Sequence, residues 1–245
     1  MDYNTRLTSN VAVVLHKPKS AENIGAAARI CTNMGINQMI VVGDSRPNHE
    51  AMAKMATHKA VHLVDGIHYC RTLAEALAPF SLIIATTGRQ GRKRTSGHPP
   101  RDIFTTVVPR LKNNPTALVF GPEDRGLTND ELKYSHFVSC IPTADFGSLN
   151  LAQAVAIHCY ELSCTLRSHN RETVPEPRYA SSHQLETMYE HLEEALITID
   201  FLDDIYHHYW MHSIRRLFGK LQLTEKDATI IRGICRKFLW HQNNK

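Results

Sequence analysis

The sequence predicts an α/β fold, a parallel sheet flanked by helices, followed by a small α-helical C-terminal extension. Short β-branched runs alternate with helical patterns through the first two-thirds of the 245 residues. Such alternation is typical of a parallel sheet with helices on both faces. The composition, 42% hydrophobic and 21% charged, is that of an ordinary globular protein. Because no apolar run approaches the ~18 residues of a membrane span, we expect no membrane association.

Six β-branched runs are predicted to form the strands, and helical patterns lie between them. The strands are expected at 11–15, 38–42, 61–64, 81–86, 116–120 and 137–141. The helices are expected at 20–34, 48–57, 71–78, 102–111, 128–134 and 148–166. Ligands of parallel sheets usually bind at the carboxyl ends of the strands. The expected ligand-binding positions are therefore the loops after Leu15, Thr86, Phe120 and Ile141.

Beyond the sheet, residues 167–179 contain two prolines and mixed charge, which is typical of a linker. An amphipathic helix is predicted by apolar residues at helical spacing, namely Leu185, Met188, Leu192, Leu196 and Ile199. A last helix is expected to open at "TEKD" (224–227), which approximates a capping box. Its predicted apolar stripe is Ile230, Ile231, Ile234, Phe238 and Leu239. We expect a main domain over 1–166, a linker over 167–182 and a helical extension over 183–245.

Cysteine and histidine usage favours a reduced, metal-free protein in the cytoplasm. None of the six cysteines belongs to a C-x-x-C pair, and several lie in apolar stretches, which favours buried thiols over disulfides or zinc. The stretch "IYHHYWMH" (205–212) has no Cys or carboxylate at a metal-ligand spacing. We interpret it as aromatic packing with surface histidines. The start of the chain lacks the layout of a signal peptide.

The segment "SAENIGAAARICTNMG" (20–35) predicts an amphipathic helix with a small-residue stripe beside its core face. The core face follows the i, i+3, i+4, i+7 rule and consists of Ile24, Ala27, Ala28 and Cys31. Gly25 and Ala26 fall on the other stripe, where they would let a ligand approach and Arg29 reach an anion or hydroxyl. The alternative is an exposed helix with a solvated arginine.

The segment "LVFGPEDRGLT" (118–128) runs from a predicted strand straight into a glycine turn. Its spacing matches the phosphate-binding loop G-x-x-x-x-G-K-[ST] except that Leu127 occupies the lysine position. The loss of that charge argues against a nucleotide hydrolase. The turn, with the charged residues Glu123, Asp124 and Arg125, suits a small polar ligand, although many strand-to-helix turns look similar for structural reasons.

A basic loop, "TTGRQGRKRTSG" (86–97), follows another predicted strand. Its three glycines and the cations Arg89, Arg92, Lys93 and Arg94 would allow it to surround phosphates. A mobile, solvated loop is the alternative. A G-x-G-x-x-G fingerprint is absent from the sequence, which weakens a dinucleotide-binding interpretation.

Polar residues open the apolar helix predicted from "FGSLNLAQAVAI" (146–157). Ser148 is expected to be the N-cap of this helix. Asn150 is then on the first turn, where capping does not explain it and where an amide beside free N–H groups would bind a ligand oxygen. We expect the apolar remainder of the helix to be buried.

Charge is unevenly distributed. The net charge is +4, but residues 205–245 carry eight basic against two acidic side chains. Such a tail is a candidate surface for an anionic ligand, although charge runs are more often solvated faces.

Three of these segments together resemble the motifs of the SPOUT (TrmH-like) RNA ribose methyltransferases. They are "ENIGAAAR" (22–29), "LVFGPEDRGL" (118–127) and "IPTADFGSLNLAQAVAI" (141–157), in matching order and separation. The segment "SIRRLFGKLQLTEKDATIIRGI" (213–234) is similar to the C-terminal extension of the TrmJ group, which methylates tRNA. The resemblance covers almost the whole chain.

This resemblance implies a parallel α/β sheet whose C-terminal part is tied in a deep trefoil knot. It also implies a homodimer with composite active sites. S-adenosyl-L-methionine would bind in the knot and leave as S-adenosyl-L-homocysteine, and no metal would be needed. The partner would be tRNA, methylated on the ribose 2′-hydroxyl of a pyrimidine (C or U) at position 32, on the 5′ side of the anticodon loop.

The resemblance also assigns roles to residues at matching positions. The catalytic set would be Asn23, Arg29, Glu123, Ser148 and Asn150. The cofactor would contact Thr86, Thr87, Gly88, Gly121, Glu123, Ile141, Ser148 and Leu149, with the glycine at 121 giving close backbone approach. RNA would contact Arg89, Arg92, Lys93 and Arg94 on the basic loop, and Arg215, Arg216, Arg232 and Arg236 in the extension.

Two other functions compete with this one. An rRNA ribose methyltransferase would keep the fold and change the substrate, but the TrmJ-like extension argues against it. A non-catalytic RNA-binding protein is disfavoured because the motif residues are intact.

Overall fold

The computed structural model describes residues 7–88, 97–144, 149–169, 177–202 and 206–243. The chain divides into two compact units, residues 1–176 and 177–245. Each unit is described by itself below.

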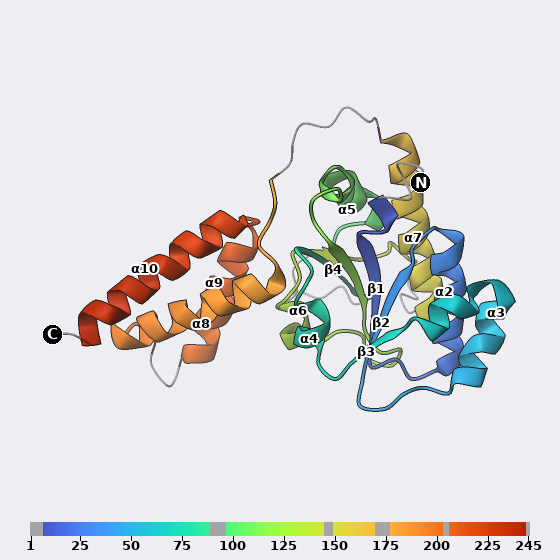
Figure 1. The fold of residues 1–245 in the computed structure, drawn as a ribbon, viewed down its shortest axis with the longest axis horizontal. Coiled ribbons are helices and arrows are strands. Elements are labelled where there is room, and N and C mark those ends of the chain that lie inside the picture. The colour runs from blue at the N-terminus through green and yellow to red at the C-terminus, as the bar shows by residue number, and fades with distance from the viewer. Residues whose placement is uncertain (1–6, 89–96, 145–148, 170–176, 203–205, 244–245) are drawn as a thin grey trace. The chain divides into compact units, whose positions relative to one another are not determined.

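The first unit is built on a six-stranded sheet in the order β3-β2-β1-β5-β4-β6, with every neighbouring pair parallel (Figure 1). The strands are β1 (Val11–His16), β2 (Gln38–Val42), β3 (His68–Cys70), β4 (Leu82–Thr86), β5 (Thr116–Phe120) and β6 (Phe137–Ser139). All residues of β1 and β5 are buried. Burial on both faces explains why these strands are continuous apolar runs rather than alternating ones.

Helices cover both faces of the sheet, as the alternation of patterns predicts. On one face lie α2 (Ala21–Asn33), α3 (His49–Asp65) and α7 (Leu151–Ser168), with α5 (Pro100–Val107) packed on α7 (Figure 1). On the other face lie α4 (Leu73–Leu77) and α6 (Asn129–Leu132). A short 3₁₀ turn, Val108–Arg110, follows α5. The core under α4 and α6 joins alternate strand residues such as Val14, Ile83 and Val119 to Leu77 and Leu127.

The predicted strand at 61–64 is wrong, because those residues form the last turn of α3. The four-residue run "VHLV" is too short for its period to separate strand from helix. Leu63 and Val64 lie at helical spacing from Ala60, and all three are buried; Thr57, with φ 61°, kinks α3 before this last part of the helix. The helix ends at Gly66, and the strand follows as β3.

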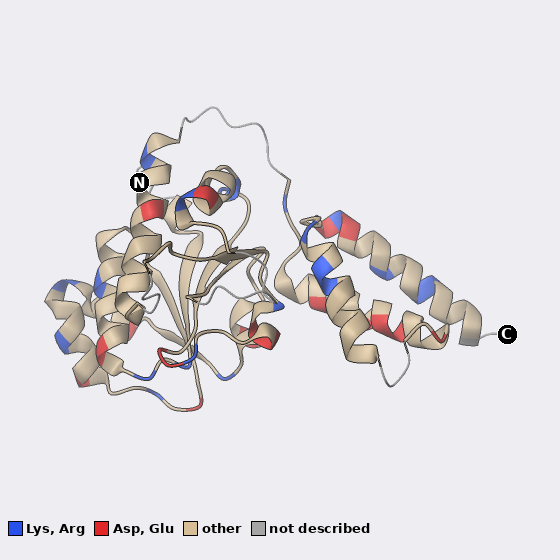
Figure 2. Cartoon of the chain, turned by 180° about the vertical axis from the view of Figure 1, so that it is seen from behind, with Lys and Arg blue, Asp and Glu red and all other residues tan. Residues whose placement is uncertain are grey.

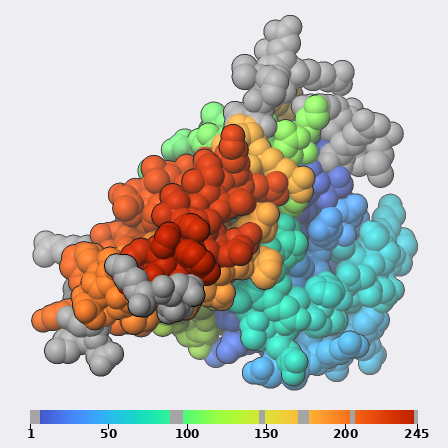
Figure 3. Space-filling view, turned by 60° about the vertical axis from the view of Figure 1, so that its left-hand side comes forward, coloured from blue at the N-terminus to red at the C-terminus, as the bar shows by residue number. Residues whose placement is uncertain are grey.

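The second unit is a bundle of α8 (Ser182–Thr198), α9 (His207–Gly219) and α10 (Glu225–Asn243). Its main contact joins α8 and α10, which lie side by side in Figures 1 and 3. The predicted start of the last helix is confirmed: Asp227 N donates to Thr224 Oγ1 (3.2 Å), and the Asp227 carboxylate accepts from Thr224 N (2.9 Å).

The predicted apolar stripe of α10 is wrong in part. Ile230 and Ile234 are 50% and 65% exposed, whereas Ala228, Cys235 and Leu239 are buried. Ala228 packs with Met188 and Tyr189, and Cys235 packs with Ala195, so these two positions of α10 face α8.

All six cysteines are unpaired, and all except Cys164 are buried, as the sequence predicts. None of the described helices is long and apolar enough to cross a bilayer.

Candidate active site

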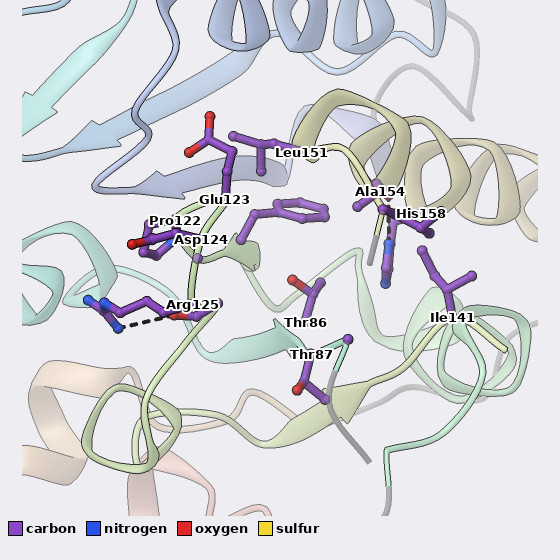
Figure 4. Close-up of a pocket in the computed structure, with 15 residues that line it drawn as sticks. Thr86, Thr87, Pro122, Glu123, Asp124, Arg125, Ile141, Leu151, Ala154 and His158 are labelled. Atoms are coloured by element: carbon purple, nitrogen blue, oxygen red, sulfur yellow. Dashed lines mark hydrogen bonds between the residues drawn. The ribbon is translucent and has the colours of Figure 1, made fainter. Parts of the chain in front are cut away.

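A cavity of about 410 Å³ opens at the carboxyl ends of β4, β5 and β6 (Figure 4). Three loops and the start of α7 line it. The lining residues are Thr86, Thr87, Gly88, Phe120, Gly121, Pro122, Glu123, Asp124, Arg125, Gly126, Ile141, Leu149, Leu151, Ala154 and His158. The loops after Thr86, Phe120 and Ile141 are three of the four positions that parallel-sheet geometry predicts for a ligand.

The residues that the sequence proposes for the cofactor meet around this cavity. Thr86, Thr87, Gly88, Gly121, Glu123, Ile141 and Leu149 all line it. Ser148 lies outside the described residues. Residues more than 60 positions apart in the chain are brought together because β4, β5 and β6 end at the same edge of the sheet.

The turn Gly121–Gly126 forms one wall of the cavity. A Cβ on Gly121 would come within 2.5 Å of the backbone of Gly126 and Leu127. Gly126 adopts φ 64° and donates its N–H to Pro122 O (2.8 Å). Gly121 therefore allows the turn to close on itself, and because it also lines the cavity, the expected close approach of the cofactor stays a prediction. Leu127 is 1% exposed in the core, so the lysine position of a phosphate-binding loop has a packing role here.

Three motif residues form one chain of hydrogen bonds. Asn150 Nδ2 donates to Asn23 Oδ1 (2.9 Å), and Asn23 Nδ2 donates to Glu123 Oε1 (2.8 Å). The Glu123 carboxylate also accepts from the backbone N–H groups of Lys19 (2.8 Å) and Ser20 (3.2 Å). These bonds join the start of α2 and the loop before it to the turn after β5 and the start of α7.

The Glu123 carboxylate is stabilised in its charged form. Partial burial by itself raises its pKa, but the hydrogen bonds from Asn23 and from the backbone N–H groups of Lys19 and Ser20 outweigh burial and lower the pKa. Glu123 is therefore an anion that fixes the orientation of the Asn23 amide.

Asn150, rather than Ser148, is the N-cap of α7, which corrects the sequence prediction. Its side chain accepts from Ala152 N (2.9 Å) and Gln153 N (3.4 Å), and Gln153 Oε1 accepts from Asn150 N. The capping box accounts for Asn150 structurally. Its Nδ2 is still available to donate to Asn23, so this one side chain both caps the helix and joins the polar chain.

Arg29 lies exposed on α2 and makes no hydrogen bond or ion pair with another residue of the described ranges.

Gly25 has a different role from the predicted one. It is buried, and a Cβ there would lie 2.0 Å from the carbonyl oxygen of Met52 on α3. Its small size serves the contact between α2 and α3 rather than a ligand. Ala26 is half-buried.

The basic-loop residues Arg89, Arg92, Lys93 and Arg94 lie outside the described residues. In the second unit, Arg216 and Arg236 are exposed, and Arg232 is half-exposed. Figure 2 shows that both signs of charge occur on the helices of this unit.

The contacts of Arg215 argue against its predicted role in RNA binding, because its guanidinium is engaged within the second unit. Its guanidinium donates to both carboxylate oxygens of Glu186 (2.6 and 2.9 Å) and lies 4.3 Å from the ring centroid of Tyr189. Only 16% of its side chain is exposed. Arg215 therefore joins α9 to α8 through these contacts.

His158 is a cavity residue that sequence analysis missed. Its Nδ1 donates to Ala154 O (2.8 Å), so its Nε2 accepts from Ser139 Oγ (2.9 Å). The ring packs edge-on against Phe120, with centroids 5.3 Å apart. Burial lowers the pKa of His158 to about 4. Its place on the apolar stripe of a helix gave no signal of a cavity position.

We expect His158 to make the fold acid-sensitive. Its pKa is about 4 in the fold and about 6.5 in the unfolded chain, so the stability it contributes is complete above about pH 6.5 and falls towards pH 4. From this group alone, the free energy of unfolding should drop by about 2 kcal/mol between pH 7.5 and pH 5.

Urea denaturation at both pH values, for the wild type and His158→Leu, measures this contribution. The pH dependence of the variant should be smaller by that amount. An identical pH dependence in the two proteins would contradict a neutral, buried His158.

Within the described ranges, no three His, Cys, Asp or Glu side chains gather into a metal-binding group.

The chain matches two family models. The model of the SpoU rRNA methylase family matches residues 10–160, and the model of the TrmJ tRNA methyltransferase C-terminal domain matches residues 183–245.

Relatives match over nearly the full length. The tRNA (cytidine/uridine/adenosine-2′-O-)-methyltransferase TrmJ of Pseudomonas aeruginosa (strain UCBPP-PA14) is 36% identical over 241 residues, which is 93% of each chain. The tRNA (cytidine/uridine-2′-O-)-methyltransferase TrmJ of Escherichia coli (strain K12) is 33% identical over 248 residues, 98% of each chain. The crystal structure of TrmJ from Z. mobilis ZM4 is similar with a TM-score of 0.78 and 28% identity, covering 92% of this chain and 97% of that one.

Proposed function

The chain belongs to the SpoU rRNA methylase family, and from this premise we propose that it is a tRNA ribose 2′-O-methyltransferase that acts on cytidine or uridine. One observation supports it above the others: the second and third motif segments line a single cavity, and the Asn150–Asn23–Glu123 hydrogen bonds join the first motif segment to them. Position 32 of the anticodon loop is the proposed target.

Two further observations favour tRNA over rRNA as the substrate. The second unit matches the TrmJ C-terminal domain, and full-length relatives at 33–36% identity are named tRNA 2′-O-methyltransferases. A non-catalytic RNA-binding role is disfavoured because the Asn150–Asn23–Glu123 hydrogen bonds are all present. Arg29 is also exposed and makes no hydrogen bond or ion pair with another described residue.

The cavity fits S-adenosyl-L-methionine in size and in chemistry. Its volume of about 410 Å³ lies in the range of small-molecule sites. Ile141, Ala154 and His158 lie on one side of it, and Glu123, Asp124 and Arg125 lie on the other (Figure 4). The apolar side suits a planar base, and the polar side suits the amino-acid part of the molecule. The loops at 86–88, 120–126 and 141–149 would hold it.

When bound, the cofactor supplies a methyl group that is already activated on a sulfonium. Catalysis by the chain is then mostly a matter of positioning the ribose hydroxyl, which contributes roughly 7–11 kcal/mol in favourable cases. Asn23 is held by Glu123 on one side and Asn150 on the other, so its amide is a rigid polar group at the cavity edge. Such preorganisation removes the need to reorient it during the reaction.

Arg29 is proposed to bind the RNA phosphate and to stabilise the negative charge that develops on the ribose oxygen. A guanidinium keeps its proton, with a pKa above ~12, and has no acceptor. It therefore cannot remove the hydroxyl proton, and we propose that an RNA phosphate oxygen accepts it.

Family membership supports four further proposals. The C-terminal part of the sheet domain forms a deep trefoil knot, and two chains form a homodimer with composite active sites. The domain limits are 1–166, 167–182 and 183–245, and the enzyme works in the cytoplasm.

Methylation of unmodified tRNA transcripts tests the proposed function directly. The protein is incubated with labelled S-adenosyl-L-methionine and tRNA carrying C or U at position 32, and the products are hydrolysed with alkali. An alkali-resistant dinucleotide that contains position 32 is expected, and it should disappear when that nucleotide is a 2′-deoxy analogue. Label on a base, or no label, would contradict the proposal.

The exposed arginines of the second unit should contribute to tRNA affinity. Replacement of Arg216 or Arg236 with alanine should weaken binding and reduce the slope of log K against log [salt] by about one. Arg215→Ala, the matched control, should leave that slope unchanged and lower the free energy of unfolding by about 1–3 kcal/mol, because Glu186 loses its partner. Filter binding at several salt concentrations measures the slopes. An effect of Arg215 on the slope equal to that of Arg236 would contradict this division.

A further inference from the structure

Glu131 is a partly buried carboxylate that none of the motifs above includes. It lies on α6, and 17% of its side chain is exposed. It accepts four hydrogen bonds, from Arg125 Nη1 (3.0 Å), Arg125 Nη2 (2.9 Å), His16 Nε2 (2.8 Å) and Thr128 N (2.7 Å). Burial by itself raises the pKa of Glu131, but the bonds from Arg125, Thr128 and His16 outweigh burial and lower the pKa to about 2. The side chain is a permanent anion that joins three segments.

His16 connects this anion to the sheet. It is the last residue of β1 and is 5% exposed. Because a carboxylate only accepts, His16 Nε2 carries the proton, and the buried Nδ1 has no partner among the described residues. Protonation would bury a second N–H group without an acceptor, and burial lowers the pKa of His16. His16 is thus a neutral donor that ties the end of β1 to α6.

Arg125 connects the same anion to the cavity wall. It lines the cavity, but its guanidinium is engaged by both oxygens of Glu131 and by Gly126 O (3.1 Å). The turn Gly121–Gly126 is therefore held at two points. Glu123 is fixed by Asn23 and by the loop after β1, and Arg125 is fixed by Glu131. The first anchor ties the turn to α2 and to the loop after β1. The second ties it to α6, which His16 joins to the end of β1, the neighbour of β5 in the sheet.

We propose that Glu131 is a positioning residue for the methyl-donor site: through Arg125 it holds the turn that walls the cavity and carries Glu123. This inference rests on the proposed function, because it assigns the donor to that cavity. It requires that the effect of Glu131 on the affinity for the methyl donor depends on Arg125.

The variant Glu131→Gln keeps the size of the side chain but removes its charge. It also turns an NH₂ group towards a hydrogen-bond donor. The dissociation constant for S-adenosyl-L-homocysteine, measured by calorimetry, should rise about tenfold, in line with a lost charge-assisted pair. The KM for S-adenosyl-L-methionine should rise with it, while the KM for tRNA changes less than twofold. If Glu131 had a purely structural role, Glu131→Gln would lower the amount of folded protein without raising the KM for S-adenosyl-L-methionine relative to the KM for tRNA.

Glu75→Gln is the matched control. Glu75 occupies the same place on α4: it follows Thr72 by three residues, donates its N–H to Thr72 Oγ1 (3.2 Å), and accepts from Arg71 N (3.0 Å). It is exposed and does not line the cavity. Its replacement should leave donor affinity within twofold of the wild type.

A double-mutant cycle with Arg125→Met tests the route. The single variant Arg125→Met should weaken donor binding as Glu131→Gln does, and the double variant should be no weaker than either single one. Additive losses, or unchanged donor affinity in folded Glu131→Gln, would overturn the proposal. If the wild type itself bound no donor, the proposed function would fail instead, so the two failures are distinguishable.

Discussion

Replacement of Arg29 with alanine is expected to reduce methyl transfer about 10³-fold while the affinity for S-adenosyl-L-homocysteine changes less than twofold. Arg29 is exposed on α2, outside the residues that line the cavity. The removed guanidinium would act on the RNA phosphate and on developing oxyanion charge, and loss of such a group costs about 10²–10³ in rate. Donor binding depends on other residues and should survive.

Single-turnover transfer to tRNA and calorimetry with S-adenosyl-L-homocysteine separate the two effects. Arg71→Ala, which removes an exposed cation from the loop after β3, serves as the control and should transfer at the wild-type rate. Equal losses of transfer and of donor affinity in Arg29→Ala would show that Arg29 belongs to the donor site, and would overturn this assignment.

Replacement of Gly25 with alanine is expected to lower the free energy of unfolding by about 3 kcal/mol. The new Cβ would lie 2.0 Å from Met52 O and 2.8 Å from Met52 C, both backbone atoms of α3. A backbone atom cannot rotate away as the end of a side chain can, so α2 and α3 would have to separate. Since α2 carries Asn23 and Arg29, transfer should fall as well.

Gly43→Ala is the matched control for Gly25→Ala. No atom lies within 4 Å of a Cβ at Gly43, and its φ is not in the left-handed region. Urea denaturation should show a change within about 0.5 kcal/mol for Gly43→Ala. A loss for Gly25→Ala as small as that for Gly43→Ala would contradict the close contact between α2 and α3.

Local patterns were sufficient for most of the sheet. β1 and β5 are β-branched runs buried on both faces, and their positions follow directly from the sequence. The third strand was missed because β3 has only three residues, "HYC", with little hydrophobic signal. The apolar run before it belongs to α3, where burial by the neighbouring helix decides its structure.

The candidate site was predictable as a set of loops but not as a set of contacts. Sheet topology brings the loops after β4, β5 and β6 to one edge. The roles of Gly25, Gly121 and Arg215 depend on long-range packing, which residue spacing does not contain. His158 and Glu131 were missed for the same reason, because their partners lie on other elements of the fold.

A crystal structure with S-adenosyl-L-homocysteine tests the central claim most directly. The ligand should lie among residues 86–88, 120–126 and 141–158, and the Asn150–Asn23–Glu123 hydrogen bonds should persist beside it. Ligand density at another place on the chain, with this cavity closed or filled by side chains, would contradict the account.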